Sequence, residues 1–371
     1  MTPSPRAASQ KDGLPTVAVV GIGQMGLVCA GLLATTDPGE VPGPAARGDS
    51  LSRPVAVKAW GHDPEEVGRI AQTRTSSRLE NFILPESVVV TTSDADALKD
   101  ADLIVSAVPV QFIRETWERL AEHVPARAGV VSVSKGIETS TLMRPTLIIA
   151  DVLRKTGRDD PDGPARRLGT LSGPTIAAEL AQCLPAAMIA ASDDEAFARE
   201  IQSLFMCHWL RVYTNTDLLG VELSGAVKNV IAIAAGIVDG LTAGNNAKSA
   251  LLARGLAEIT RLGVAMGATP DTFFGIAGVG DLATTCFSPE GRNRSCGEAL
   301  GKGQKLDEYL KKSQHVVEGV QTARSVMALA EKYRIPMPIT QAVHAVLFEK
   351  VDPIEAIGML MSRDPKAERV G

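Results

Sequence analysis

The chain is 371 residues long, 45% of them hydrophobic, and its formal net charge at pH 7 is -5. This length and apolar content suffice for two domains, each with a sizeable core. The scattered, balanced charges exclude a general binder of nucleic acids or membrane surfaces, although a small anionic ligand needs only a local cluster of cations. Five cysteines without a CxxC pair indicate reduced thiols.

Residues 1–14 are polar and contain no apolar segment of the kind that a secretory signal needs, so we expect a disordered tail. No uncharged apolar run elsewhere reaches about 18 residues, the length that a transmembrane helix requires. We therefore expect no membrane span and a cytoplasmic location.

Between residues 15 and 213, strand patterns alternate with helical ones. "TVAVVG" at 16–21 predicts a buried parallel strand, and the helical pattern "LVCAGLLATT" follows it. Residues 37–54 are rich in Pro, Gly and Ser and predict an insertion loop at the surface. Further strands are predicted in "VAVKAWGHD", "ESVVVTTS", "ADLIVSAVP", "GVVSVSKG", "RRLGTLSGP" and "LPAAMIAAS". The alternation predicts an α/β domain with a doubly wound parallel sheet.

After residue 213 the β-rich patterns give way to helical ones. Segments rich in Ala, Leu and Gly with helical periodicity occupy 218–238, 247–266, 294–301, 320–333 and 338–348. We therefore expect two domains, an α/β domain at 15–213 and an all-α helical domain at 214–371.

The first strand ends in a glycine-rich turn. "VAVVGIGQMG" places Gly21, Gly23 and Gly26 in a complete GxGxxG between a predicted strand and a predicted helix. The first glycine allows the tight turn, the second lets backbone approach a pyrophosphate, and the third lets helix and strand pack closely. The helix N-terminus supplies free N–H groups to phosphate. In this context the motif predicts a dinucleotide-binding domain rather than a tight turn without a ligand.

An acidic residue about 20 positions beyond such a turn binds the adenosine ribose. Asp63 lies 42 residues after Gly21, or 23 once the insertion at 36–54 is removed. The neighbouring His62 is an alternative contact that would face the 2′-phosphate of NADP. The sequence therefore predicts NAD or NADP as the cofactor and leaves the choice open.

A lysine interrupts the most apolar helical segment. In "ELSGAVKNVIAIAAG", residues 222–236, Lys228 stands among small apolar side chains, where an unpaired ammonium is costly. Its stem can snorkel to solvent, which is the structural alternative. However, Lys228 shares a helical stripe with Ser224 and Asp239, and this favours an internal polar site.

Polar groups at other turns can supply such a site. They are Lys135 in "VSKGIE", Ser172, Gly173 and Thr175 in "LSGPTIAAEL", Asp281 in "GVGDLATTC", Arg292, Asn293 and Arg294 in "SPEGRNRSCG", and Glu318 in "HVVEGVQT". Taken singly, each has a structural explanation. Ser172 and Thr175 are expected to cap a helix, and Lys135, Arg292 and Arg294 are expected to be ordinary solvent-exposed cations. Their combination with a buried lysine favours one shared polar site.

Together these segments resemble bacterial NAD(P)-dependent glycerol-3-phosphate dehydrogenase, from about residue 15 to residue 350. The similar segments are "VVGIGQMG", "WGHDPE", "SKGIE", "SGPTIAAEL", "LPAA", "RVYTNTDLLGVELSGAVKNVIAIAAGIVDGL", "GNNAKSALLARGLAEITRLG", "GVGDLATTC", "GRNRSCG" and "VVEG". Relatives that share only the fold, such as ketopantoate reductase, would not combine "GAVKNV", "GDL" and "RNR".

The resemblance implies a Rossmann-like domain followed by a helical domain like the C-terminal domain of 6-phosphogluconate dehydrogenase, with the active site between them. It implies reversible hydride transfer between NAD(P)H and dihydroxyacetone phosphate, giving sn-glycerol 3-phosphate for phospholipid synthesis. A small phosphate substrate, a homodimer and no metal are expected.

By match of motif, the resemblance implies that Lys228 is the catalytic acid/base and that Asp281 assists it. The implied substrate site consists of Lys135, Gly173, Thr175, Lys228, Asp281, Arg292 and Asn293. The implied cofactor site consists of Gly21, Gly23, Gln24, Met25, Gly26, His62, Asp63, Lys135, Ala177, Arg292, Val316 and Glu318. The chain departs from the family pattern at Gln24, Met25 and Gly291, the last of which replaces a frequent serine.

Two other functions stay open at this point. A dehydrogenase of the same fold that acts on another small hydroxy or keto acid would use the same cations, although "GDL" with "GRNR" favours phosphate. A dinucleotide-sensing protein without turnover would be expected to lose Lys228, Lys135 or Asp281, and all three are present.

Overall fold

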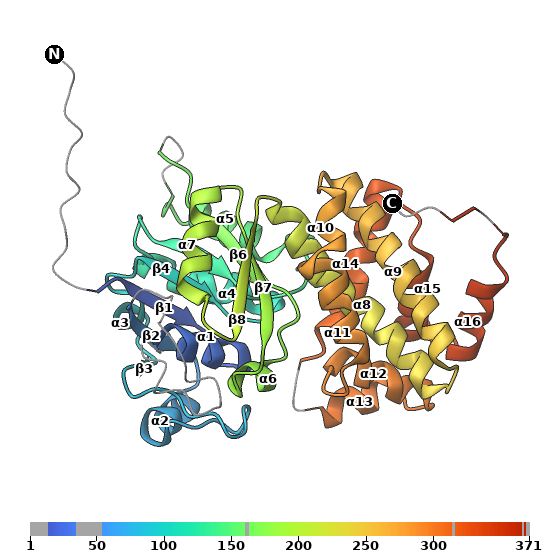
Figure 1. Ribbon diagram of the computed structural model, residues 1–371, viewed down its shortest axis with the longest axis horizontal. Helices are drawn as coiled ribbons and strands as arrows, with labels where there is room; N and C mark the ends of the chain where they lie inside the picture. Colours follow the sequence, from blue (N-terminus) through green and yellow to red (C-terminus); the bar gives the residue numbers. More distant parts are fainter. Residues whose placement is uncertain (1–13, 35–53, 160–162, 314–315, 366, 369–371) are drawn as a thin grey trace, which may run out of the picture.

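A computed structural model describes residues 14–34, 54–159, 163–313, 316–365 and 367–368. The first half of the chain, blue to green in Figure 1, forms a sheet covered by helices, and the second half, yellow to red, is helical. Apart from Leu14 and Pro54, the expected tail at 1–14 and the expected insertion at 37–54 lie outside the described residues.

The α/β half is built on an eight-stranded sheet within the described residues, with the strand order β3-β2-β1-β4-β5-β6-β7-β8. Its strands are β1 Thr16–Val20, β2 Ala56–Trp60, β3 Val89–Thr91, β4 Leu103–Ser106, β5 Gly129–Ser132, β6 Leu168–Ser172, β7 Ala186–Ala191 and β8 Leu210–Asn215. Its helices are α1 Gln24–Ala34, α2 Pro64–Thr73, α3 Asp94–Leu98, α4 Val110–Leu120, α5 Pro145–Lys155, α6 Ala177–Ala181 and α7 Glu195–Phe205. Apolar side chains of α1 and α7 cover one face of the sheet, and those of α4 and α5 cover the other.

The doubly wound α/β architecture is confirmed, with one difference in strand direction. The pair β6 and β7 is antiparallel, whereas every other neighbouring pair in the sheet is parallel. The connection between these two strands contains only the five-residue helix α6, and the chain turns back instead of crossing over the sheet. The last strand also continues to Asn215, two residues beyond the predicted domain end at 213.

The helical half contains all five predicted helices, with ends that differ by at most a few residues. Its helices are α8 Leu218–Gly240, α9 Asn245–Met266, α10 Pro270–Phe274, α11 Asp281–Phe287, α12 Arg292–Gly301, α13 Leu306–Lys312, α14 Glu318–Tyr333, α15 Pro338–Phe348 and α16 Pro353–Met361. The centre is α8, which is long and apolar enough to cross a membrane but has its whole apolar window buried inside the protein. It is therefore the core helix of this domain.

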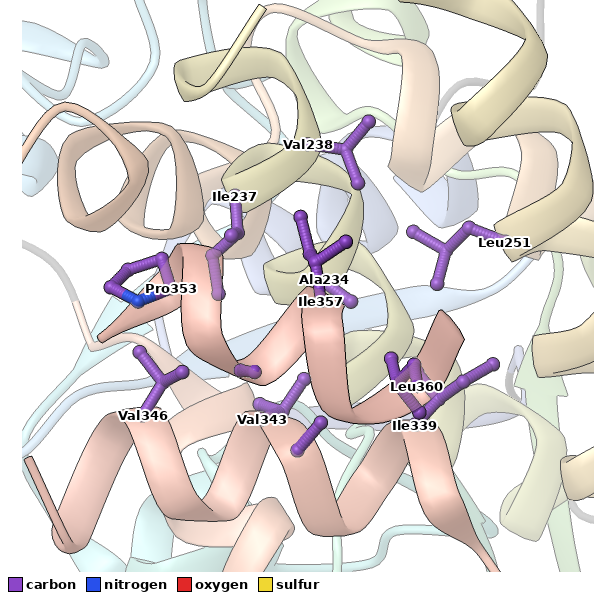
Figure 2. A pocket seen from close by; sticks show the side chains of 12 residues that line it. Ala234, Ile237, Val238, Leu251, Ile339, Val343, Val346, Pro353, Ile357 and Leu360 are labelled. Carbon is purple, nitrogen blue, oxygen red and sulfur yellow. The ribbon is translucent and has the colours of Figure 1, made fainter. Parts of the chain in front are cut away.

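Helix α16 leaves a small pocket against α8, α9 and α15, shown in Figure 2. Its labelled walls include Ile237 of α8, Leu251 of α9, Val343 of α15 and Ile357 of α16. Every residue that lines this pocket is apolar, so it offers no partner for a phosphate or a dinucleotide.

Candidate active site

The glycine-rich turn has the geometry that its sequence predicts. It leads from β1 into α1, and β1 lies between β2 and β4, where the strand order of the sheet reverses. Gly21 has φ +105°, and a Cβ on Gly26 would lie 1.8 Å from the carbonyl oxygen of Gly21. A Cβ on Gly23 would meet no described atom within 4 Å, so the space above the turn is open. These residues fit a dinucleotide pyrophosphate.

Three of the predicted cofactor residues near this turn, Gln24, Met25 and Asp63, make contacts within the protein. Gln24 begins α1 and donates to the carbonyl oxygen of Arg78 at 2.6 Å, and Met25 packs against the core. Asp63 caps α2, where Oδ1 accepts from the backbone N–H of Glu65 at 2.9 Å. The sequence "HDPEE" already carried this signal, because Asp followed by Pro and acidic residues is typical of a helix start.

The polar cluster around Lys228 lies at the junction of the two domains. Nζ of Lys228 donates to Oδ1 of Asp281 at 2.6 Å, and the second oxygen of Asp281 accepts from Nζ of Lys135 at 2.7 Å. Nζ of Lys135 also donates to the carbonyl oxygen of Gly173 at 2.9 Å and to Oγ1 of Thr175 at 3.4 Å. The structure thus brings together five predicted site residues from both domains.

A short π-helix over Ile276–Gly280 places Asp281 beside Lys228. Gly278 lies so close to the preceding turn that a Cβ there would sit 1.8 Å from the carbonyl oxygen of Phe273. Ser224 of α8 donates to the carbonyl oxygen of Ala277 at 2.9 Å and ties this segment to the helix of Lys228. A π-helix is rare and is frequently found at functional sites.

Burial dominates the electrostatics of the cluster. Lys228 is 5% exposed, and desolvation lowers its pKa to about 8. The Asp281 carboxylate opposes this shift, while the positive charge of Lys135 adds to it. Burial also raises the pKa of Glu318 at the start of α14, against the attraction of Arg292 and the two lysines.

The predicted phosphate end lies at the start of α12. Arg292 is exposed, and its Nη1 is 3.5 Å from the carbonyl oxygen of Val316. Asn293 is 8% exposed, and its Oδ1 accepts from the backbone N–H of Gly319 at 2.9 Å. These contacts join the start of α12 to the start of α14, which carries Glu318.

The predicted N-cap at Ser172 and Thr175 is wrong. Helix α6 begins at Ala177 after Ile176, and no described side chain caps it. The Oγ of Ser172 is buried without a hydrogen-bond partner among the described residues, and Thr175 accepts from Lys135 instead. After β6 the chain bends at Gly173, whose φ is +123°, and the Gly173 carbonyl and the Thr175 hydroxyl both accept from Lys135.

One residue of the cluster, Thr285, was missed at the sequence level. Oγ1 of Thr285 accepts a short hydrogen bond from Lys228, and it lies one helical turn after Asp281. The spacing of four residues in "DLATT" was the available signal for Thr285.

One domain contains a glycine-rich dinucleotide turn, and the central helix of the other carries a buried lysine whose pKa is lowered to about 8. This combination is typical of a dinucleotide-dependent dehydrogenase. Comparison with known proteins gives the family. Residues 16–198 match the model of the NAD-dependent glycerol-3-phosphate dehydrogenase N-terminus, and residues 217–358 match that of its C-terminus.

Individual relatives agree with the family models. The chain is 46% identical over 313 residues to glycerol-3-phosphate dehydrogenase [NAD(P)+] 1 of Salinibacter ruber, covering 84% of this chain and 90% of that protein. It is 41% identical to the Listeria monocytogenes enzyme, covering 95% and 98%. The crystal structure of the Coxiella burnetii enzyme matches with a TM-score of 0.84 and 31% identity over 94% and 99% of the two chains. The chain belongs to the NAD(P)-dependent glycerol-3-phosphate dehydrogenases.

Proposed function

We propose that Lys228 is the proton donor and acceptor in the interconversion of dihydroxyacetone phosphate and sn-glycerol 3-phosphate by this chain. The observation that carries the proposal is the buried Lys228, which is paired with Asp281 and whose pKa is lowered to about 8. A group with a pKa near the working pH both gives and takes a proton readily. When bound, NAD(P)H supplies the hydride.

Ketone reduction places growing negative charge on the carbonyl oxygen, and a proton donor must stand there. Protonated Lys228 gives its proton to that oxygen, and neutral Lys228 takes the proton back in the reverse direction. Asp281 and Thr285 hold Nζ of Lys228 in place through their hydrogen bonds. Lys135, bound to the same carboxylate, adds positive charge that stabilises the oxyanion.

We assign the other predicted residues to the phosphate and carbonyl ends of the substrate and to the dinucleotide cofactor. Arg292 and Asn293 bind the substrate phosphate, because a planar guanidinium matches the geometry of a phosphate. Gly173 and Thr175 line the carbonyl end, next to Lys135. The cofactor residues are Gly21, Gly23, Gln24, Met25, Gly26, His62, Asp63, Lys135, Ala177, Arg292, Val316 and Glu318. The open turn at Gly23 supports the pyrophosphate end of this assignment.

An assay of the purified chain tests the substrate assignment directly. Oxidation of NADH and of NADPH is followed with dihydroxyacetone phosphate, and with small keto acids as the alternative substrates. We expect rapid consumption with the phosphate substrate and much slower consumption with the keto acids. Consumption with a keto acid alone, or with no substrate, would reject the assignment.

We propose further that the chain works as a homodimer in the cytoplasm. The outer face of α16 supports the dimer, because Ile354 and Met361 are 68% and 80% exposed. The five free cysteines, all within the described ranges, support a reducing compartment. Light scattering after size exclusion tests the dimer: Ile354→Asp is expected to give monomers, and a monomeric parent chain would reject it. Cell fractionation tests the location, with recovery in the membrane pellet as the contrary result.

A further inference from the structure

Arg294 is the one arginine of "GRNR" to which the proposed reaction gives no task, and its guanidinium joins three helices. Its Nη1 donates to Oδ2 of Asp239 on α8 at 2.6 Å, and its Nε donates to the carbonyl oxygen of Ser288 after α11 at 2.9 Å. Its Nη2 lies 3.1 Å from Oε2 of Glu298 on α12 itself. The side chain is 13% exposed, whereas Arg292, two residues earlier, is exposed.

Asp239, the partner of Arg294 on α8, is also held by a second cation, Lys248. Nζ of Lys248 donates to both oxygens of Asp239, at 2.9 and 2.7 Å. The Lys248 side chain is 8% exposed and lies over the ring of Phe287, with Nζ 4.8 Å from the ring centroid. Because two enclosed cations hold the carboxylate of Asp239 from two sides, it has little freedom to turn.

The first turn of α12 depends on these contacts for its position. Its N-cap is Gly291, and no described side chain caps the helix. At Arg294 the backbone of α12 touches α8 directly, since a Cβ on Gly236 would lie 1.9 Å from the carbonyl oxygen of Arg294. Close backbone contact and the guanidinium therefore fix the same turn that carries Arg292 and Asn293.

We infer that Arg294 is a positioning residue for phosphate recognition. Its contact with Asp239 on α8 holds the first turn of α12, and therefore Arg292 and Asn293, in the orientation that binds phosphate. The inference rests on the proposed phosphate role of Arg292. The guanidinium nitrogens of Arg294 contact Asp239, Ser288 and Glu298, so we assign Arg294 no contact with the phosphate itself. A displacement of about 1 Å in a group that positions the substrate costs about a hundredfold in rate. Helix α8 thus carries the proton donor Lys228 and also sets the place of the phosphate end.

Arg294→Lys tests the inference, because a lysine ammonium cannot reproduce three contacts made by a planar fork. The assay compares kcat/KM for dihydroxyacetone phosphate with kcat/KM for dihydroxyacetone, which has the same carbonyl and no phosphate. We expect the first to fall about tenfold or more and the second to stay unchanged. Lys302→Met is the matched control, because Lys302 is an exposed ion-pair partner of Glu298 on the same side of α12.

Equal losses for both substrates would show that Arg294 only supports the fold, and no loss for either would show that it positions nothing. Either result overturns the inference. Asp239→Asn gives the same comparison if Arg294→Lys fails to fold. In an Arg292→Lys background, Arg294→Lys is expected to add little, and full additivity would also overturn the inference. If Arg292→Lys alone leaves the preference for the phosphate substrate unchanged, the proposed role of Arg292 fails instead.

Discussion

Lys135 and Lys228 reach the same carboxylate from different domains. Lys135 follows β5 in the α/β domain, Lys228 lies on α8 in the helical domain, and each donates to one oxygen of Asp281, at 2.7 and 2.6 Å. The two ammonium groups are therefore held close together, and the repulsion between them lowers the pKa of Lys228. The contacts at the domain junction thus lower the pKa of the proposed proton donor and also fix its position.

Replacing Lys228 removes the proposed proton donor. Lys228→Met keeps most of the side-chain volume, and we expect kcat to fall by about 10²- to 10⁴-fold, the usual contribution of general acid–base catalysis. Binding of NADH, followed by its fluorescence, is expected to stay unchanged, because the glycine-rich turn lies in the other domain. Lys302→Met serves as the control, and near-normal kcat in Lys228→Met would contradict the acid–base role.

The two directions of the reaction are expected to depend on pH with opposite signs. Reduction needs protonated Lys228, so its kcat/KM falls as pH rises through about 8, where burial places the pKa of Lys228. Oxidation needs neutral Lys228, so its kcat/KM rises over the same interval. Asp281 opposes the lowering of this pKa, so Asp281→Asn should move the midpoint to lower pH in both directions. Profiles with the same slope in both directions would exclude Lys228 as the titrating group.

Arg292→Lys keeps the charge at the proposed phosphate site and removes the planar fork. We expect a higher KM for dihydroxyacetone phosphate, with a loss of about 1.5–3 kcal/mol of binding free energy, the range for hydrogen bonds to charged groups. The rate with dihydroxyacetone is the internal control, because that compound has no phosphate. An unchanged KM for the phosphate substrate would show that Arg292 does not bind the substrate phosphate.

The junction between the domains also contains a buried ion pair that the sequence analysis did not foresee. Glu222 of α8 is fully buried and accepts from Arg144, from the backbone N–H of Thr146 at 2.9 Å and from Oγ1 of Thr146 at 2.7 Å. Glu222→Ala leaves these donors unpaired, so we expect the free energy of unfolding to fall by about 3–5 kcal/mol in urea titrations.

Glu222→Gln keeps the shape and one acceptor oxygen, and it is expected to lose less stability than Glu222→Ala. Arg199→Ala removes the exposed pair Arg199–Glu195 and is expected to change the unfolding free energy by less than about 1 kcal/mol. If Glu222→Ala and Arg199→Ala had the same free energy of unfolding, the buried pair Glu222–Arg144 would not stabilise the domain junction.

The sequence predicted the features that depend on local pattern. Apolar runs and helical periodicity located most strands and the five long helices, and the glycine spacing located the turn after β1. The helices α5 and α16, of 11 and 9 residues, were not predicted, and neither was the antiparallel direction of β7. Strand direction depends on how a connection crosses the sheet, which no periodicity in the strand itself records.

For the site, the motifs contained polar residues that the structure brings into contact, but they did not predict which residue contacts which. Lys228 was predicted to belong to an internal polar site because it stands among small apolar residues, and the structure places it in a buried polar cluster with Asp281. Its contacts with Asp281 and Thr285 needed the fold, because they cross from α8 to α11. The N-cap predicted at Ser172 and Thr175 was wrong, because Thr175 accepts from Lys135 after β5 instead, and Ser172 has no side-chain hydrogen bond to a described residue.

Helix α8 is enclosed along its whole apolar window, and the side chains of Glu222 and Lys228 are 0% and 6% exposed, so almost no solvent reaches them to replace a lost partner. Glu222, Lys228 and Asp239 each depend on an opposite charge from a different segment: Arg144, Asp281, and Lys248 with Arg294. A change at Glu222 or Lys228 is therefore tolerated only together with a change at its partner, whereas solvent reaches Asp239, whose side chain is 24% exposed. In any collection of functional variants of this chain, Glu222 and Lys228 should each vary together with its partner, while their apolar neighbours on α8 vary singly.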